Sequence, residues 1–213
     1  MINKYLAETM GTFILVGLGS LGILAVGGPS GAAELIAIGL GFGLALLAAL
    51  WVAGHVSGGH FNPAVTLAFL LNKEMSLSDA IGYWVGQFAG ASLASLVIWA
   101  VAGSRQAVSQ TATTYDDLNT AIVIEIVLTA VFVWTILAVV KRGSLQAPLA
   151  ISMVLVGIHI VGIPFSGASV NPARSFGPAA IAGDFGPIGV YFYAPLIGAV
   201  IAWALYRLFP VDE

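Results

Sequence analysis

The sequence contains no cysteine and very little charge. The absence of cysteine excludes disulfides, thiolate metal sites and cysteine catalysis, and it leaves the redox compartment undetermined. Charged residues make up only 8% of the chain, whereas an average soluble domain has about 25%. The formal net charge is only −3, so nucleic acid is not an expected partner. A chain with so few charges is not suited to facing water on all sides.

Long uncharged runs account for the shortage of charge. No Asp, Glu, Lys or Arg occurs in residues 35–72, 80–104 or 143–173. Hydrophobic residues make up 59% of the chain, and the mean hydropathy is +1.01. Because a helix needs about 20 apolar residues to cross a bilayer, these runs predict an all-α membrane protein that crosses the bilayer several times.

Turn residues and charges divide the chain into six predicted spans. Three spans fall in each half, about 1–101 and 118–213, and a polar linker at 102–117 joins the halves into a single expected domain over 1–213. The N-terminal apolar run is interpreted as a retained span, because it is long for a signal peptide and no clear cleavage site ends it. The spans are expected at 5–26, 34–54, 79–101, 118–140, 147–163 and 187–208.

Two segments inside the uncharged runs repeat one pattern. Residues 57–64 read SGGHFNPA and residues 166–173 read SGASVNPA, with the second Asn 109 residues after the first (171 − 62). The halves also resemble each other around their first and third spans. Since each half has an odd number of spans, the second half starts on the opposite side of the membrane. The sequence therefore predicts an inverted repeat with its functional elements near the midplane.

Each repeated segment, at 55–71 and 164–182, has the residue order of a re-entrant half-helix. Small residues suit an irregular stretch, Asn is a favoured N-cap, and Pro fits the first helical position. The apolar helices expected next, Ala64–Leu71 and Ala173–Ala182, have about ten residues and reach only about halfway across a ~30 Å core. Two half-helices from opposite faces would meet at their N-termini and present loop carbonyls to a pore.

These features together resemble the aquaporins, the major intrinsic protein family, over essentially the full chain. The resemblance rests on the paired motifs, on Glu8 and Glu125, and on the six-span inverted layout. It implies a passive channel for water rather than an enzyme, set in a lipid bilayer as a homotetramer with one pore per subunit, without cofactor or metal. The motif residues are Asn62, Pro63, Ala64, Asn171, Pro172 and Ala173.

The resemblance also implies an outer selectivity filter, whose spacing from the motifs gives four positions: Phe42, His159, Ala168 and Arg174. This set looks like the water-selective pattern of the family. Glycerol-conducting relatives usually carry Asp after the motif arginine, and this chain has Ser175 there. The expected function is therefore passive water conduction that excludes protons and ions, and a facilitator for glycerol or other small neutral solutes is the alternative.

The simpler interpretation of each site residue is structural. Phe42 alone would be a packing aromatic, and His159 alone a packing histidine, so only their register with the motifs favours a filter. Arg174 is harder to explain in this way, because a charge in an apolar run is costly unless it faces water or carbonyls. Glu8 and Glu125 are expected to be structural, accepting hydrogen bonds from loop N–H groups that would otherwise be unsatisfied.

Basic residues predict the orientation in the membrane. With both termini in the cytoplasm, only Arg105 falls in an outside loop, and five basic residues fall inside. This distribution agrees with the positive-inside rule, and the chain is expected in the cell (plasma) membrane. The five inside residues are Lys4, Lys73, Lys141, Arg142 and Arg207.

Two other classes of protein are alternatives. An ion-coupled transporter also uses inverted repeats, but it usually has more spans and an embedded carboxylate at its ion site, for which Glu8 and Glu125 are the candidates. An intramembrane enzyme needs a nucleophile or a metal constellation, and neither HExxH nor GxSxG occurs.

His55 and His60, which lie before the first motif, are expected to bond nearby backbone.

Overall fold

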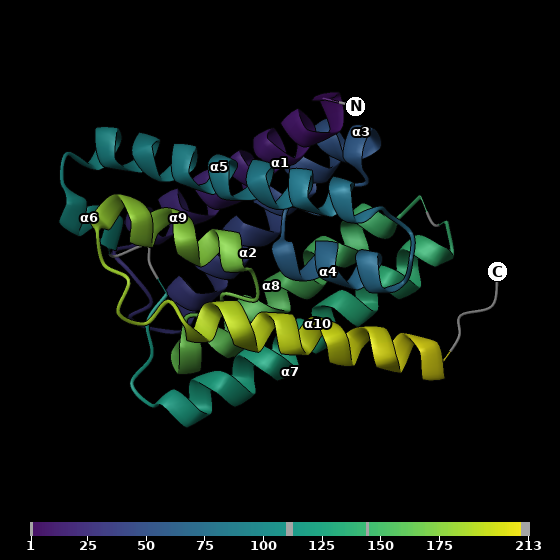
Figure 1. The fold of residues 1–213 in the computed structure, drawn as a ribbon. Helices are drawn as coiled ribbons and strands as arrows, with labels where there is room; N and C mark the ends of the chain where they lie inside the picture. The colour runs from purple at the N-terminus through teal and green to yellow at the C-terminus, as the bar shows by residue number, and fades with distance from the viewer. Residues whose placement is uncertain (1, 110–112, 144, 210–213) are drawn as a thin grey trace.

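The computed structural model describes residues 2–109, 113–143 and 145–209, and every regular element within them is a helix. Six helices among these residues are long and apolar enough to cross a membrane, as predicted, and Figure 1 shows them gathered into one bundle. Met1, residues 110–112 of the expected linker, Ser144 and residues 210–213 lie outside the described residues. The long helices are α1 (Ile2–Ala25), α2 (Ala32–Ala49), α5 (Leu77–Ala102), α7 (Leu118–Lys141), α8 (Ala147–Ser166) and α10 (Val190–Leu208).

The second span continues past the predicted residue 54. A π-helical turn, η1 (Leu50–Gly54), and a short helix, α3 (His55–Ser57), follow α2 without a break. Gly58 then takes a left-handed conformation with φ +89°, which a residue without a side chain adopts at little cost. The irregular part of the first re-entrant segment is therefore shorter than expected and begins at Gly58.

The fifth span is also longer than predicted, and the sixth begins later. α8 runs to Ser166 rather than to 163, although Pro164 lies inside its last turn. Proline can be accommodated this close to the end, where the loss of one N–H affects only the final turn. The next residue, Gly167, has φ +74° and ends the helix. The sixth span begins at Val190 rather than at 187.

The ends of several helices are fixed by local side chains. Ser76 caps α5 by accepting a hydrogen bond from the Asp79 N–H at 3.1 Å, and Asp117 caps α7 by accepting one from the Thr120 N–H at 2.6 Å. Hydrogen bonds from the side chain and backbone of Thr120 also hold the pKa of the Asp117 carboxyl below its usual range. A short helix, α6 (Arg105–Ser109), lies in the connection between these two spans.

The two predicted half-helices are α4 (Pro63–Leu71) and α9 (Pro172–Ala182), and each begins at its proline. They contain 9 and 11 residues, which correspond to about 14 and 17 Å at about 1.5 Å per residue. Neither can cross a hydrocarbon core about 30 Å thick by itself. The chain therefore enters the protein interior and returns to the same side.

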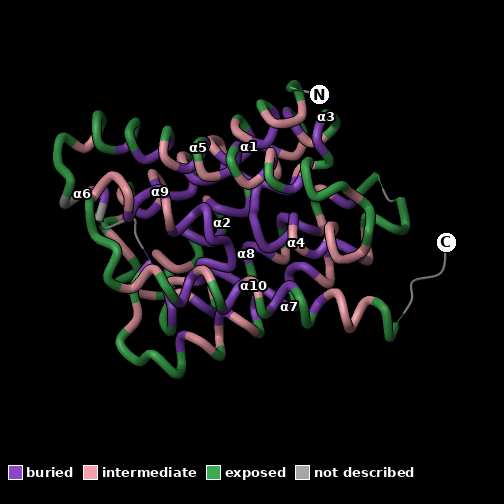
Figure 2. The backbone as a smooth tube through the Cα atoms, in the orientation of Figure 1, coloured by how far each residue is buried: buried purple, intermediate pink, exposed green. Residues whose placement is uncertain are grey.

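The half-helices lock the two halves of the chain together. In each half the first span packs against the third, α1 on α5 and α7 on α10. Each half-helix packs more extensively against the third span of the opposite half than against that of its own half, α4 against α10 and α9 against α5. Buried residues follow this interior through the molecule, whereas exposed residues lie along its outer helices and at its ends (Figure 2).

Large apolar side chains cover the outside of the helix bundle. Val85, Val101 and Trp51 have exposed fractions of 65%, 70% and 70%. An apolar exterior of this kind is suited to lipid, and a helix satisfies its own backbone hydrogen bonds there. Charge is found at the helix ends, where Lys4 pairs with Asp79 at 2.7 Å. The chain is a membrane protein that crosses the bilayer several times.

Glycines let the spans approach one another closely. A Cβ at Gly90 of α5 would lie 2.2 Å from the Thr9 carbonyl oxygen of α1, and one at Gly198 of α10 would lie 2.6 Å from the Ile126 carbonyl oxygen of α7. These contacts are between backbones, which cannot move aside as a flexible side chain could. The two related helix pairs, α1 with α5 and α7 with α10, thus depend on a missing side chain.

We expect Gly90→Ala to destabilise the protein even though alanine is the better helix former. The new methyl group would meet the Thr9 carbonyl, and overpacking of this kind costs about 1–3 kcal/mol. Gly157→Ala is the matched control, because a Cβ there would meet no heavy atom within 4 Å. Thermal unfolding of the detergent-solubilised variants provides the measurement, and equal apparent Tm values for both would contradict this explanation.

Candidate functional site

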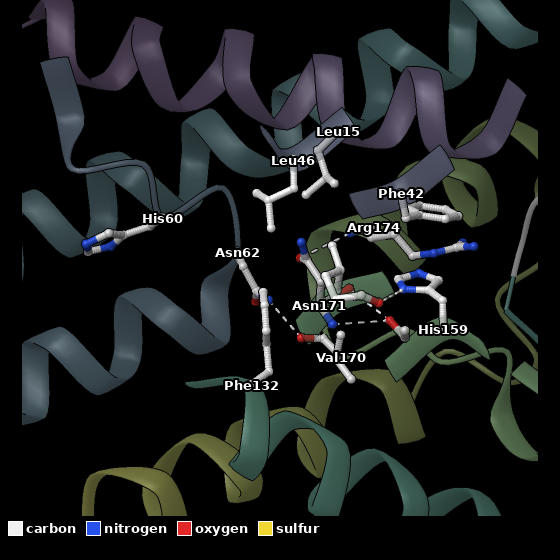
Figure 3. A pocket seen from close by; sticks show the side chains of 12 residues that line it. Leu15, Phe42, Leu46, His60, Asn62, Phe132, His159, Val170, Asn171 and Arg174 are labelled. Atoms are coloured by element: carbon white, nitrogen blue, oxygen red, sulfur yellow. Dashed lines mark hydrogen bonds between the residues drawn. The ribbon is translucent and has the colours of Figure 1, made fainter. Parts of the chain in front are cut away.

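A narrow cavity lies where the N-termini of the two half-helices meet (Figure 3). Its volume is about 20 Å³, just above the roughly 10–15 Å³ that one water molecule needs. The motif residues Asn62 and Asn171 lie between the two ends of this cavity in the figure. The lining residues are Leu15, Phe42, Leu46, His60, Asn62, Phe132, Leu155, His159, Ser169, Val170, Asn171 and Arg174.

The two motif asparagines each have two roles. Their Oδ1 atoms cap the half-helices, Asn62 accepting from Ala64 N at 2.8 Å and Asn171 from Ala173 N at 3.0 Å. Their Nδ2 atoms donate across the molecule, from Asn62 to the Val170 carbonyl at 2.7 Å and from Asn171 to the Phe61 carbonyl at 2.9 Å. An amide nitrogen carries two hydrogens, so each asparagine keeps a second one for a molecule in the cavity.

The carbonyls that accept these bonds belong to residues in an unfavourable conformation. Phe61 has φ +49° and Val170 has φ +46°, a left-handed region that bulky and β-branched residues rarely occupy. Such residues cost on the order of 1–3 kcal/mol each and persist only where the surroundings hold them. Each one immediately precedes a motif asparagine, so its conformation sets the direction of the half-helix that follows.

Glu8 holds the first re-entrant loop. Its Oε1 accepts from Ser57 Oγ at 2.7 Å and from His60 N at 3.0 Å. Its Oε2 accepts from Phe61 N at 2.7 Å and from Gln87 Nε2 at 2.7 Å. Because every partner is a donor, the carboxylate is filled with hydrogen bonds on both oxygens. Its side chain is completely buried.

Glu125 makes the equivalent bonds in the second half. It accepts from Ser166 Oγ at 2.7 Å, Ser169 N at 2.8 Å and Val170 N at 2.7 Å. The structure thus brings each carboxylate to the loop of its own half, where it bonds the N–H of the left-handed residue. Among the described residues, the fourth bond of the first half has no counterpart here, because Pro195 stands in α10 where α5 has Gln87.

Two tyrosines complete the loop supports and were not singled out from the sequence as site residues. The Tyr83 hydroxyl donates to the Ser57 carbonyl at 2.5 Å, and the Tyr191 hydroxyl donates to the Ser166 carbonyl at 2.7 Å. Both occupy the same place in the two halves. The sequence signal that could have identified them is a tyrosine repeated at the same place in the third span of each half.

Three of the four expected filter residues meet at one end of the cavity (Figure 3). The ring of Phe42 from α2 stacks on that of His159 from α8, with centroids 4.2 Å apart and planes inclined by 16°. The Arg174 guanidinium from α9 lies 4.9 Å from the Phe42 ring centroid. Three separate helices therefore close this end with two rings and one cation.

The hydrogen bonding of His159 assigns its tautomer. Its Nδ1 lies 3.0 Å from the Leu155 carbonyl, which can only accept, so Nδ1 carries the hydrogen. In the neutral ring Nε2 is then an acceptor, and it has no hydrogen-bond partner within the described parts of the chain. This end of the cavity thus offers a cation and an acceptor nitrogen close together.

Ala168, the fourth expected filter residue, is placed differently from the other three. It lies in the same loop with φ +48°, but its side chain is completely buried and does not line the cavity. A Cβ at Gly162 of α8 would lie 3.0 Å from the Ala168 Cβ, so the alanine faces that helix closely. Arg174 lines both the cavity and an outer pocket that contains Gly167.

His60 lies at the opposite end of the cavity from the filter residues (Figure 3). Its Nδ1 lies 3.1 Å from the Thr66 hydroxyl, and its ring packs on Phe69 and Tyr83. The expectation that it bonds backbone was wrong, because its ring bonds the Thr66 side chain. His55, at the end of the second span, is exposed.

Comparisons with known proteins agree with this geometry. The family model described as "Major intrinsic protein" matches residues 1–206. The maize protein "Aquaporin TIP2-1" is 39% identical, over 96% of this chain and 86% of that protein. "Glycerol uptake facilitator protein-like 6" of Lactiplantibacillus plantarum is also 39% identical, over 94% and 95%. "Aquaporin Z" of Photorhabdus laumondii is 34% identical, over 98% and 97%.

A solved structure has the same fold. The X-ray structure of the aquaglyceroporin from Plasmodium falciparum superposes with a TM-score of 0.85, covering 96% of this chain and 95% of that chain. The two sequences are 23% identical, so this likeness concerns the fold alone.

We expect Glu8→Gln to destabilise the protein strongly. A glutamine amide would place hydrogens against two of the four donors that Glu8 now accepts, and each unsatisfied buried donor costs about 1–3 kcal/mol. Glu74→Gln, at an exposed position, is the matched control and should leave unfolding unchanged. Chemical unfolding in detergent tests this, and a Glu8→Gln variant as stable as the control would disprove the supporting role.

Proposed function

Because the chain belongs to the major intrinsic protein family, whose members are membrane channels rather than enzymes, we propose that it is a passive water-selective channel. The observation that carries the proposal is the meeting of Phe42, His159 and Arg174 at the end of a cavity of about 20 Å³. A gap of this size suits water and is small for a larger solute.

The paired asparagines suit the passage of single water molecules. In the proposal, the free amide hydrogens of Asn62 and Asn171 donate to one water oxygen. That water then points its own hydrogens toward its neighbours and cannot accept from them. A chain of water molecules interrupted in this way conducts water without relaying protons.

The half-helices oppose cations at the same place. Each N-terminus is equivalent to about +0.5 charge. Two of them at ~4 Å, with an effective dielectric constant near ~20, raise the energy of a monovalent cation by roughly 4 kcal/mol. This corresponds to nearly three decades of suppression at about 1.4 kcal/mol per decade. Arg174 adds a full positive charge, whereas neutral water is not affected by these barriers.

The alternative is a facilitator for glycerol or other small neutral solutes. The relative from L. plantarum carries that name at the same identity as the maize aquaporin, so overall identity does not discriminate. The stacked rings of Phe42 and His159 favour water, because they occupy space that a larger solute would need. A secondary transporter is disfavoured, because Glu8 and Glu125 are filled with bonds to loop donors.

The proposal also includes the setting of the channel. The cluster Lys141 and Arg142 at the end of α7 supports an orientation with both termini in the cytoplasm, and the plasma membrane is the proposed location. A homotetramer is proposed as the assembly. Its support is the resemblance to the family, and the apolar outer surface of α1 and α2, where Leu18 and Leu44 are 52% and 59% exposed, could face either lipid or a neighbouring subunit.

Osmotic flux across vesicles tests the substrate. Proteoliposomes without any ion gradient should shrink much faster than lipid vesicles under an osmotic step, and glycerol uptake should stay near the lipid background. A flux of water that required an ion gradient would favour the transporter. Glycerol uptake as large as that of a known facilitator would establish the alternative instead.

Widening the filter should admit larger neutral solutes. In the double variant His159→Gly with Arg174→Val, one ring and the cation are removed, so urea and glycerol should enter while water flux is maintained. Proton leak should stay limited, because the half-helix barrier of roughly 4 kcal/mol remains. Val85→Ala, at a lipid-facing position, is the control. Continued exclusion of urea by a folded double variant would show that the constriction lies elsewhere.

A further inference from the structure

A chain of three hydroxyls links two parts of the molecule. It connects Thr113 to the second half-helix, α9, and Thr113 lies in the connection between α5 and α7, here called the outer segment, which also contains α6. Thr113 Oγ1 lies 2.7 Å from Ser175 Oγ, and Ser175 Oγ lies 2.5 Å from Ser169 Oγ. The three residues are 3%, 1% and 2% exposed, so all three are buried. Thr113 comes from a segment far away in the sequence, whereas the two serines flank Arg174 on either side.

The direction of these bonds follows from counting protons. Ser169 Oγ donates to the Asn171 carbonyl at 3.0 Å, so its single hydrogen is committed. Ser175 must therefore donate to Ser169, and Thr113 must donate to Ser175. The chain thus runs in one direction, from Thr113 to the carbonyl of the motif asparagine.

The end point of this chain is the part of the loop that orients the filter arginine. Ser169 lies between two left-handed residues, Ala168 and Val170. The Asn171 carbonyl also receives the Ser175 N–H at 3.3 Å, which closes the first turn of α9. Arg174 leaves from this same turn. A displacement here would move its guanidinium relative to the two rings that it faces.

Thr113 also lies directly against the second re-entrant loop. A Cβ at Gly167 would lie 3.2 Å from the Thr113 Cα and 3.3 Å from its Cβ. The preceding helix of the outer segment, α6, packs against α9. The outer segment therefore contacts both the start of the second re-entrant loop and the half-helix α9.

We infer that Thr113, Ser175 and Ser169 are positioning residues that set the width of the pore at Arg174 and so determine which neutral solutes pass. This inference rests on the proposed function as a water-selective channel. Ser169 also lines the cavity, but the role inferred for all three does not require contact with the permeating solute. They act by holding the first turn of α9 against the outer segment, which keeps Arg174 close to Phe42 and His159.

The matched pair Thr113→Val and Thr113→Ser tests the role of the hydroxyl. Valine keeps the shape and removes the donor, whereas serine keeps the donor and loses a methyl group. In proteoliposomes, we expect Thr113→Val to raise the ratio of urea to water permeability about fivefold to tenfold, because the loss of one buried hydrogen bond shifts an equilibrium by about that factor. Thr113→Ser should keep the ratio of the original chain.

Ser175→Ala removes the middle of the chain and should raise the same ratio. If Thr113→Val fails to fold, the ratio measured for Ser175→Ala still tests whether the hydroxyl chain positions Arg174. Combining the two substitutions should raise the ratio no further than the larger single effect, because both break one connected unit. A ratio unchanged in both folded single variants would overturn the inference. So would Thr113→Ser behaving like Thr113→Val, since packing alone would then explain the effect.

Measurements on the unsubstituted protein distinguish a failure of the proposed function from a failure of this inference. If it carries no water, the proposed function fails and this inference fails with it. If it carries water and excludes urea, but Thr113→Val and Ser175→Ala leave the ratio unchanged, only the positioning role fails.

Discussion

Two buried carboxylates hold the backbone of Phe61 and Val170 in a conformation that their side chains disfavour. Each carboxylate accepts the N–H of its residue at 2.7 Å, and an asparagine from the other half binds the carbonyl. Both polar groups of each peptide are thus satisfied by buried partners within the protein, and this offsets a conformational cost on the order of 1–3 kcal/mol. The rest of the pore depends on this pair of residues.

The pair of left-handed residues also explains why the two halves must fold together. The carbonyl of Phe61 needs Asn171, and the carbonyl of Val170 needs Asn62, so neither loop is satisfied within its own half. The half-helices repeat this exchange, since α4 packs on α10 and α9 on α5. An inverted repeat of this kind is a single cooperative unit, even though its sequence reads as two similar pieces.

The spans and half-helices could be predicted because their signals are local. Uncharged runs, a capping asparagine and a proline at the first helical position act through neighbouring residues, so one sequence suffices. Helix ends were less accurate, because a single left-handed glycine such as Gly58 decides where the second span stops. The Thr113–Ser175 contact was out of reach, because it joins residues 62 positions apart through a polar segment with no periodic pattern.

The two halves of the otherwise symmetric scaffold differ in how their re-entrant loops are supported. In the first half, the support extends inward, as Gln87 and Thr66 link the loop carboxylate to the ring of His60. In the second half, proline replaces that glutamine, and the support extends outward through hydroxyls to Thr113. Symmetry therefore builds the narrow centre, where both halves donate equally. The departures from symmetry place a histidine at one end of the cavity and an externally held arginine at the other.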